Sequence, residues 1–154
     1  MLIGTGKHKY EWIDNWAKTP SSDSATTSWA HHGVAITETG YIITALQDSR
    51  TMVILDKQGN IQNTWDSGLT AAHGITIVKE DKNEYLWLAD CGRNRLQEIG
   101  YEYPESEQVT GQIVKTTLTG EVILTLDTPN IPIYHSGDYM PTSVAVNEER
   151  HDGN

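Results

Sequence analysis

The sequence predicts an all-β fold made of repeated four-stranded antiparallel sheets. The segment 32–36 (HGVAI) returns 41 residues later as 73–77 (HGITI), and a partial third copy (PTSVAV) starts at 141. Runs of β-branched and aromatic residues alternate with Gly, Asn and Asp turns, and no segment keeps a helical period. A repeat of about 40 residues built from short strands is typical of β-propeller blades. We therefore expect a β-propeller segment of about two and a half four-stranded blades.

The strands of the two complete copies follow from the alternation of apolar and polar residues between turns. In the first copy we expect strands at 32–37, 41–46, 52–55 and 61–65. In the second copy we expect strands at 73–78, 85–89, 112–117 and 122–126. Gly59 and Gly120 stand in matching turns before the last strand of each copy. Each copy thus predicts one blade, with its first strand at the channel and its last strand at the rim.

The remaining segments indicate incomplete blades at both ends. We expect 9–16 to be the outer strand of a preceding blade and 141–146 the inner strand of a following one. The single incomplete domain, 1–154, then divides into 1–29 (outer strand and linker), 30–66 (blade), 67–127 (blade with a long loop after its second strand) and 128–154 (loop and inner strand). Because unpaired sheet edges promote aggregation, we expect the missing strands to come from the remaining blades of a longer parent or from other copies of the chain.

The composition restricts the class of ligand. A net charge of −10 argues against a nucleic-acid surface, which requires clustered Lys and Arg. No apolar stretch approaches the roughly 20 residues of a membrane span. Cys91 is the only cysteine, so no disulfide forms within the chain. These features suit a soluble protein whose ligand, a small molecule or a peptide, is neutral, cationic or held through a metal, and they leave its compartment open.

His32 and His73 open the first strands of the two copies at equivalent positions. Neighbouring inner strands of a propeller converge at the channel, so the two imidazoles are expected to approach one point there. Imidazole is the commonest metal ligand, and a catalytic zinc has three protein ligands with a fourth position open. The alternative is that each histidine only caps its own loop by a hydrogen bond. Because the two histidines stand at matching positions of the repeat, we give equal weight to two interpretations: contact with a metal or substrate, and loop capping.

Two long loops are expected on the same face as these histidines. Loop 91–111 contains Arg93 and Arg95, and loop 127–141 contains Tyr134 and His135. A guanidinium can bind a substrate carboxylate through two parallel hydrogen bonds, and long structured loops on one rim are often functional. We therefore name these four residues as candidate substrate-binding groups. For Arg50, the equivalent of Arg93 in the first copy, we favour a structural ion pair with Asp48.

The segment 73–77, an acidic turn and 85–90 (YLWLAD) resemble an NHL repeat, and 111–115, 120–124 and 140–146 extend the similarity. In order and spacing, residues from roughly 60 to 150 are similar to the six-bladed lyase domain that cleaves peptidyl-α-hydroxyglycine to an amidated peptide and glyoxylate. The resemblance implies a six-bladed ring of NHL type and a zinc ligand at His73, and it adds calcium as a further cofactor. Met140 stands where that family has a disulfide cysteine.

Two functional hypotheses follow from these observations. The first is a metal-assisted, lyase-like site at the channel mouth, with His73 and His32 as ligands and with activity that belongs to the full-length parent. The second is a non-catalytic binding propeller whose rim loops recognise a peptide or a glycan. NHL blades support both, since a fold alone does not set a function.

Overall fold

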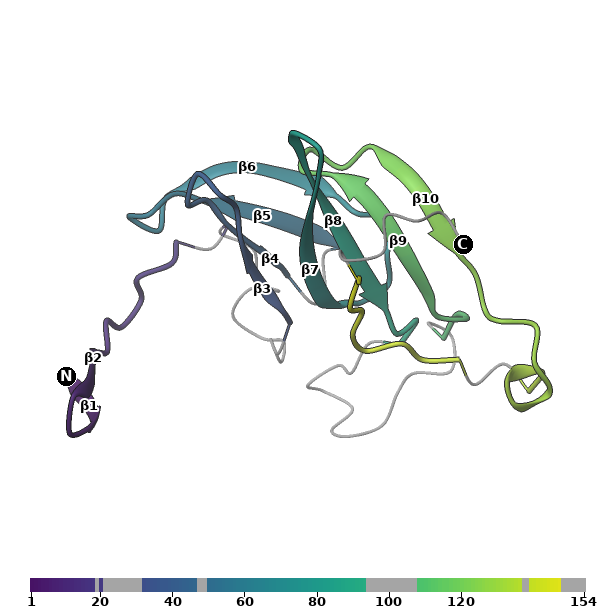
Figure 1. The fold of residues 1–154 in the computed structure, drawn as a ribbon, viewed down its shortest axis with the longest axis horizontal. Coiled ribbons are helices and arrows are strands. Elements are labelled where there is room, and N and C mark those ends of the chain that lie inside the picture. Colours follow the sequence, from purple (N-terminus) through teal and green to yellow (C-terminus); the bar gives the residue numbers. More distant parts are fainter. Residues whose placement is uncertain (19, 21–31, 47–49, 94–107, 137–138, 148–154) are drawn as a thin grey trace.

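The computed structural model describes residues 1–18, 20, 32–46, 50–93, 108–136 and 139–147 (Figure 1). Its main part consists of two four-stranded sheets that lie side by side. The first sheet has the order β3 (Val34–Ile36), β4 (Ile42–Ala45), β5 (Thr51–Leu55) and β6 (Ile61–Asp66). The second has the order β7 (Ala72–Glu80), β8 (Asn83–Asp90), β9 (Gln112–Thr117) and β10 (Val122–Leu126). Every pair of neighbouring strands is antiparallel.

The all-β class and the two antiparallel sheets confirm the sequence prediction. The last two strands of the second sheet match the expected ranges to the residue, while β7 and β8 each run longer than expected. The β5–β6 turn is built around Asp56, whose Oδ1 accepts the Gln58 and Asn60 N–H groups over 2.8 and 2.9 Å. Hydrogen bonding to Asn60, first through its side chain, lowers the pKa of Asp56 from the ordinary value of 3.8. This turn fixes the register of the outer strand.

The core lies where the two sheets face each other. Ile43 and Met52 of the first sheet and Leu86 and Leu88 of the second have no exposed surface, and they belong to one apolar cluster with Leu69. Such burial is the main driving force for joining the sheets, at about 1.5–3 kcal/mol for each large side chain. At one end of the interface, Lys79 Nζ lies 2.7 Å from Glu38 Oε2.

The first strands of the two sheets are neighbours in space. The Gly33 N–H, just before β3, donates to the His73 carbonyl oxygen of β7 over 2.8 Å. A Cβ atom on Gly33 would lie 2.8 Å from Ile75 N, which is too close for any residue other than glycine. The same contact recurs between the second sheet and segment 139–147, because a Cβ on Gly74 would lie 2.6 Å from the Thr142 carbonyl oxygen. The first-strand contact is therefore repeated along the chain.

The outer ends of the sheets also make a repeated contact. The β9–β10 turn packs on the first sheet, where a Cβ on Gly120 would lie 2.5 Å from the Trp65 ring. Gly59 of the β5–β6 turn packs against Trp16, chiefly against its backbone carbonyl group, with the ring atom Cδ2 at 3.2 Å from an added Cβ. In both sheets the turn before the last strand thus packs through its glycine on a tryptophan that precedes it in the sequence.

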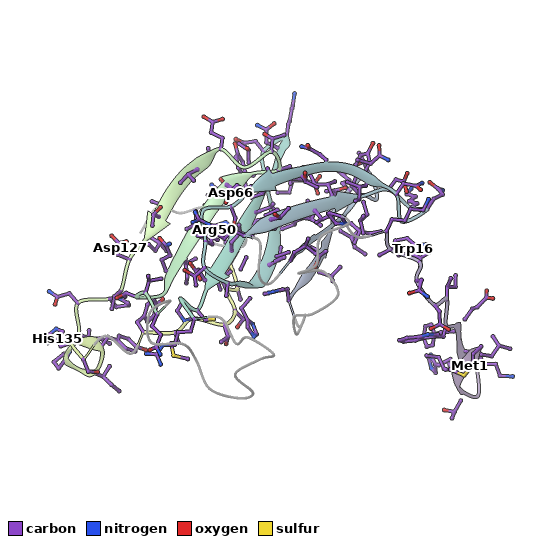
Figure 2. The ribbon with its side chains drawn as sticks, turned by 180° about the vertical axis from the view of Figure 1, so that it is seen from behind. Met1, Trp16, Arg50, Asp66, Asp127 and His135 are labelled. Atoms are coloured by element: carbon purple, nitrogen blue, oxygen red, sulfur yellow. The ribbon has the colours of Figure 1, made fainter. Side chains whose placement is uncertain are left out.

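The N-terminal segment differs from the prediction. Segment 9–16 was expected to be one outer strand, but β2 (His8–Glu11) ends earlier and pairs only with β1 (Leu2–Thr5) in a two-stranded hairpin. Figures 1 and 2 show this hairpin apart from the two sheets, with Met1 far from Arg50. Trp12, which follows β2, is 54% exposed. A two-stranded hairpin has no second layer to cover it, so its apolar side chains remain at the surface.

The C-terminal segment also differs in part. Residues 141–146 were expected to be an inner strand, and no strand is assigned there. The segment nevertheless runs beside β7, where the Thr76 hydroxyl donates to the Val144 carbonyl oxygen over 2.7 Å. The only helical element in the described ranges is a short 3₁₀ turn, η3 (Pro132–Tyr134). Among these residues no helix has the length and apolar character that a membrane crossing needs.

Candidate functional site

The structure brings His32 and His73 together at the ends of the two first strands. Their ring centres lie 6.4 Å apart, with the ring planes at 78°. His32 immediately precedes β3, and His73 is the second residue of β7. The backbone bond from Gly33 to the His73 carbonyl oxygen holds the two segments at this separation. This geometry agrees with the prediction from the sequence that the two imidazoles approach one point.

A β-bulge directs the His73 side chain. In the pairing of β7 with β8, Ala72 faces Asp90 and Gly74 faces Ala89, so His73 is the extra residue of the bulge. A bulge of this kind bends the strand and redirects one side chain, and bulges are frequent beside functional sites. The repeated phrase in the sequence gave the position of His73 but not this irregularity, because a bulge has no composition signal here.

One ring nitrogen of His73 is engaged by the backbone. Nδ1 lies 3.1 Å from the Thr142 carbonyl oxygen. Since a carbonyl oxygen only accepts hydrogen bonds, Nδ1 carries the proton in this contact. The neutral ring then has its lone pair on Nε2, which is the arrangement found in metal-ligating histidines whose other nitrogen donates to a carbonyl.

Within the described residues, the histidine pair can supply two metal ligands. No group of three or more His, Cys, Asp or Glu side chains with metal-binding geometry occurs within the described parts of the chain. His31 and the candidate Arg95 lie outside the described residues. The two imidazoles suit zinc, whose Zn–N distances are about 2.0–2.1 Å, better than calcium, which takes oxygen ligands.

The other candidate substrate-binding residues lie elsewhere or have local partners. Tyr134 belongs to η3 and makes an edge contact with Tyr139, with ring centres 5.0 Å apart. His135 Nε2 lies 3.2 Å from Asn130 Oδ1 within the same loop. Figures 1 and 2 show this loop beyond β10, away from β3 and β7. The structure therefore does not bring Tyr134 and His135 to the histidine pair. Arg93 is half-buried just after β8, and the Cys91 Sγ contacts its carbonyl oxygen at 3.3 Å.

Asp90 holds the loop that leads into β7. Its side chain has no exposed surface. Oδ1 accepts the Ala71 and Gly92 N–H groups over 2.9 Å each, and Oδ2 accepts the Thr70 N–H over 3.1 Å. The contacts by which Asp90 braces this loop thus include three backbone amides. These bonds fix the start of β7 and hence the position of His73.

Burial also determines the state of Cys91. The residue is buried, and desolvation raises the pKa of its thiol above the ordinary value of 9.0. A thiol with a raised pKa is protonated at neutral pH and is a poor nucleophile. This agrees with a packing role for Cys91.

Arg50 forms an ion pair with Asp66; the ion pair expected with Asp48 is not tested. Asp48 lies outside the described residues, and the Arg50 Nε lies 3.5 Å from Asp66 Oδ1. Both side chains are more than half exposed, so this pair contributes little to stability.

Comparison with known proteins gives no relationship: no family model, curated protein or solved structure matches the chain.

Proposed function

We propose that the two sheets are adjacent blades of an NHL-type β-propeller and that the chain contributes to a metal-assisted, lyase-like site at the mouth of its channel. The repeated contacts support the propeller. Gly33 packs on β7 as Gly74 packs on 141–146, and the turn glycines Gly120 and Gly59 each pack on a preceding tryptophan, on the ring of Trp65 and chiefly on the backbone carbonyl of Trp16. Contacts that recur from one sheet to the next are expected when four-stranded sheets succeed one another around an axis.

One observation carries the metal site: the His32–His73 pair, in which the Nδ1 of His73 is bound to the Thr142 carbonyl. In this proposal His73, through Nε2, and His32 are the two ligands that the chain supplies to the ion. A zinc ion held there would act as a Lewis acid or lower the pKa of a bound hydroxyl group. The chain's own part is to fix the ring orientation through Thr142 and the strand separation through Gly33. In the parent, the remaining ligands are proposed to come from other blades.

The second candidate function is a non-catalytic binding propeller. The Tyr134–Tyr139 edge contact favours it, because paired aromatic rings on a surface loop provide a rigid amphipathic contact area. In this case the loop after β10 would recognise a peptide or a glycan, and the histidine pair would only cap the adjoining loops.

Zinc binding separates the two candidates. Metal-free protein is titrated with zinc in competition with a chromophoric chelator, and the bound metal is counted by elemental analysis. The metal-site proposal expects about one zinc per chain. It also expects a large loss of affinity in His73→Ala and His32→Ala, of roughly tenfold or more, because each variant removes a ligand. His135→Ala is the matched control, since His135 bonds only within its own loop as far as the structure describes it.

Zinc stoichiometry and affinity that are the same in His73→Ala as in the unmodified chain would contradict the metal site and leave the binding propeller. For the lyase chemistry, the readout is release of glyoxylate from a peptide that ends in α-hydroxyglycine, measured on the full-length parent with and without zinc. Zinc-dependent release is expected.

A further inference from the structure

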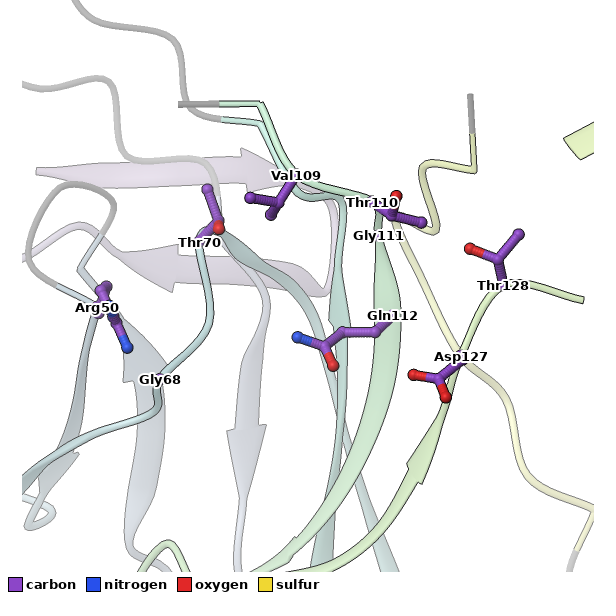
Figure 3. A pocket seen from close by; sticks show the side chains of 9 residues that line it. All are labelled: Arg50, Gly68, Thr70, Val109, Thr110, Gly111, Gln112, Asp127 and Thr128. Atoms are coloured by element: carbon purple, nitrogen blue, oxygen red, sulfur yellow. The ribbon is translucent and has the colours of Figure 1, made fainter. Parts of the chain in front are cut away.

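A groove between the two sheets forms a second candidate site, separate from the histidine pair. It has a volume of about 490 Å³ and is open on one side. Figure 3 shows its lining residues, which come from the start of β5, the β6–β7 loop, the start of β9 and the end of β10: Arg50, Gly68, Thr70, Val109, Thr110, Gly111, Gln112, Asp127 and Thr128. This volume lies within the range of small-ligand sites, about 300–1,000 Å³.

One wall of the groove carries a positioned cation. The Arg50 backbone is in the left-handed region at φ 55°. Its carbonyl oxygen accepts both the Ser67 N–H and the Ser67 hydroxyl over 2.8 Å each. The guanidinium lies beside Gly68 of the β6–β7 loop, along this wall of the groove. Its ion pair with Asp66 is through Nε, and among the described residues no ion pair involves the two terminal nitrogens, which can bind a ligand anion.

The opposite wall carries an anion and a buried hydroxyl group. Asp127 directly follows β10, is exposed, and forms no ion pair within the described residues. In Figure 3 its carboxylate is directed toward the groove, and the Gln112 side chain lies between it and Arg50. The neighbouring Thr128 Oγ1 is buried and has no hydrogen-bond partner among the residues described. A buried polar atom of this kind is costly to leave without a partner.

We propose that this groove binds a short zwitterionic peptide, with its carboxylate at Arg50, its ammonium group at Asp127, and its peptide bonds along Gln112 and the threonine hydroxyls. A guanidinium binds a carboxylate through two parallel hydrogen bonds. Among the residues that the structure describes, no aromatic ring lines the groove, and aromatic faces are what quaternary ammonium groups and stacked bases require. A ligand that carries both a carboxylate and an ammonium group pairs with Arg50 and Asp127 at the same time, whereas a single anion or a single cation pairs with only one of them.

The proposal rests on neither the zinc site nor the tyrosine pair, and blocked peptides test it directly. Isotope-labelled protein is titrated with triglycine, N-acetyl-triglycine, triglycine amide and the doubly blocked peptide, and amide resonances are followed by NMR. Triglycine is expected to shift the amides of Thr70, Gly111, Gln112 and Thr128, and to bind roughly tenfold or more tightly than either singly blocked peptide.

Two variants assign the charged groups. Arg50→Gln is expected to weaken triglycine binding roughly tenfold or more and to leave binding of triglycine amide unchanged, because the amide has no carboxylate. Asp127→Asn is expected to weaken triglycine but not N-acetyl-triglycine. Lys82→Gln and Glu121→Gln are the matched controls, since each removes the same charge from a turn outside the groove. If Arg50→Gln shifts amide resonances outside the groove, its loss of binding can come from a wider structural change. Asp127→Asn then decides whether the groove binds the peptide, because Asp127 lies at an exposed strand end.

Equal binding of the doubly blocked peptide would overturn the proposal, and so would the absence of any shift at the groove amides. Zinc removal is expected to leave triglycine binding unchanged, and Arg50→Gln is expected to leave zinc binding unchanged. The two sites can therefore fail independently.

Discussion

Replacement of Asp90 by alanine tests how the loop before β7 is held. The carboxylate is fully buried and accepts three backbone N–H groups, two at Oδ1 and one at Oδ2. Two of these bonds are to Thr70 and Ala71, which lead into β7, and the third is to Gly92, which follows β8. Asp90→Ala removes both acceptor oxygens and with them all three hydrogen bonds.

The magnitude follows from the number of amides left without an acceptor. An unsatisfied buried donor costs about 1–3 kcal/mol, and the Ala71 and Gly92 bonds are buried while the Thr70 bond is partly buried. Two to three such groups give a loss of about 3–6 kcal/mol in the free energy of unfolding. That is a large part of the about 5–15 kcal/mol that stabilises an ordinary domain. Asp90→Asn keeps the shape but replaces one acceptor with a donor, so we expect a loss of about 1–3 kcal/mol.

Urea unfolding followed by tryptophan fluorescence measures these differences by linear extrapolation. Asp127→Ala is the matched control, because Asp127 is exposed and the same atoms are removed; we expect a change within about 0.5 kcal/mol. Hydrogen exchange of the Ala71 and Gly92 amides gives a local readout, and both should lose protection in Asp90→Ala. A loss of less than about 1 kcal/mol, with unchanged protection of these two amides, would refute the assigned role of Asp90.

Three further predictions follow. Hydrogen bonds to Asn60 lower the pKa of Asp56 in the folded state. The stabilisation that they give is therefore present above pH 3.8 and is lost as the pH falls through the lowered pKa. Asp56→Asn should reduce the pH dependence of the free energy of unfolding in that acid range, measured by urea unfolding. The buried Cys91 thiol, whose pKa burial raises, should react with a thiol reagent at pH 7 far more slowly in the native chain than in urea, and equal rates would show that it is accessible. Gly74→Ala places a methyl group against the Thr142 carbonyl oxygen. It should displace that carbonyl from His73 and lower the zinc affinity, although it removes no ligand. Unchanged affinity would count against the role of Thr142 in orienting the His73 ring.

Much of the fold could be derived from the sequence because the chain repeats itself. Strong alternation at 112–117 and 122–126, bounded by turn residues, gave β9 and β10 to the residue. The N-terminal segment was harder, since its tryptophans resemble core residues while their partners are not set by local pattern. Trp16 does pack on Gly59, whereas Trp12 is exposed. Only the three-dimensional arrangement distinguishes the two.

The site was partly derivable for the same reason. Matching positions in two adjacent repeats were enough to bring His32 and His73 together. The contact of His73 with Thr142 and the bulge that directs its ring depend on a segment 69 residues away and on strand pairing, and neither has a local signal. The groove was not found from sequence either, because its charged walls, Arg50 and Asp127, come from different sheets.

X-ray absorption at the zinc edge of the zinc-loaded chain tests the metal site most directly. The account expects at least two imidazole nitrogens at about 2.0–2.1 Å from the ion. It also expects one imidazole to be lost from the spectrum of His73→Ala and none from that of His135→Ala. A spectrum with no imidazole ligands, or one that His73→Ala leaves unchanged, would contradict the account.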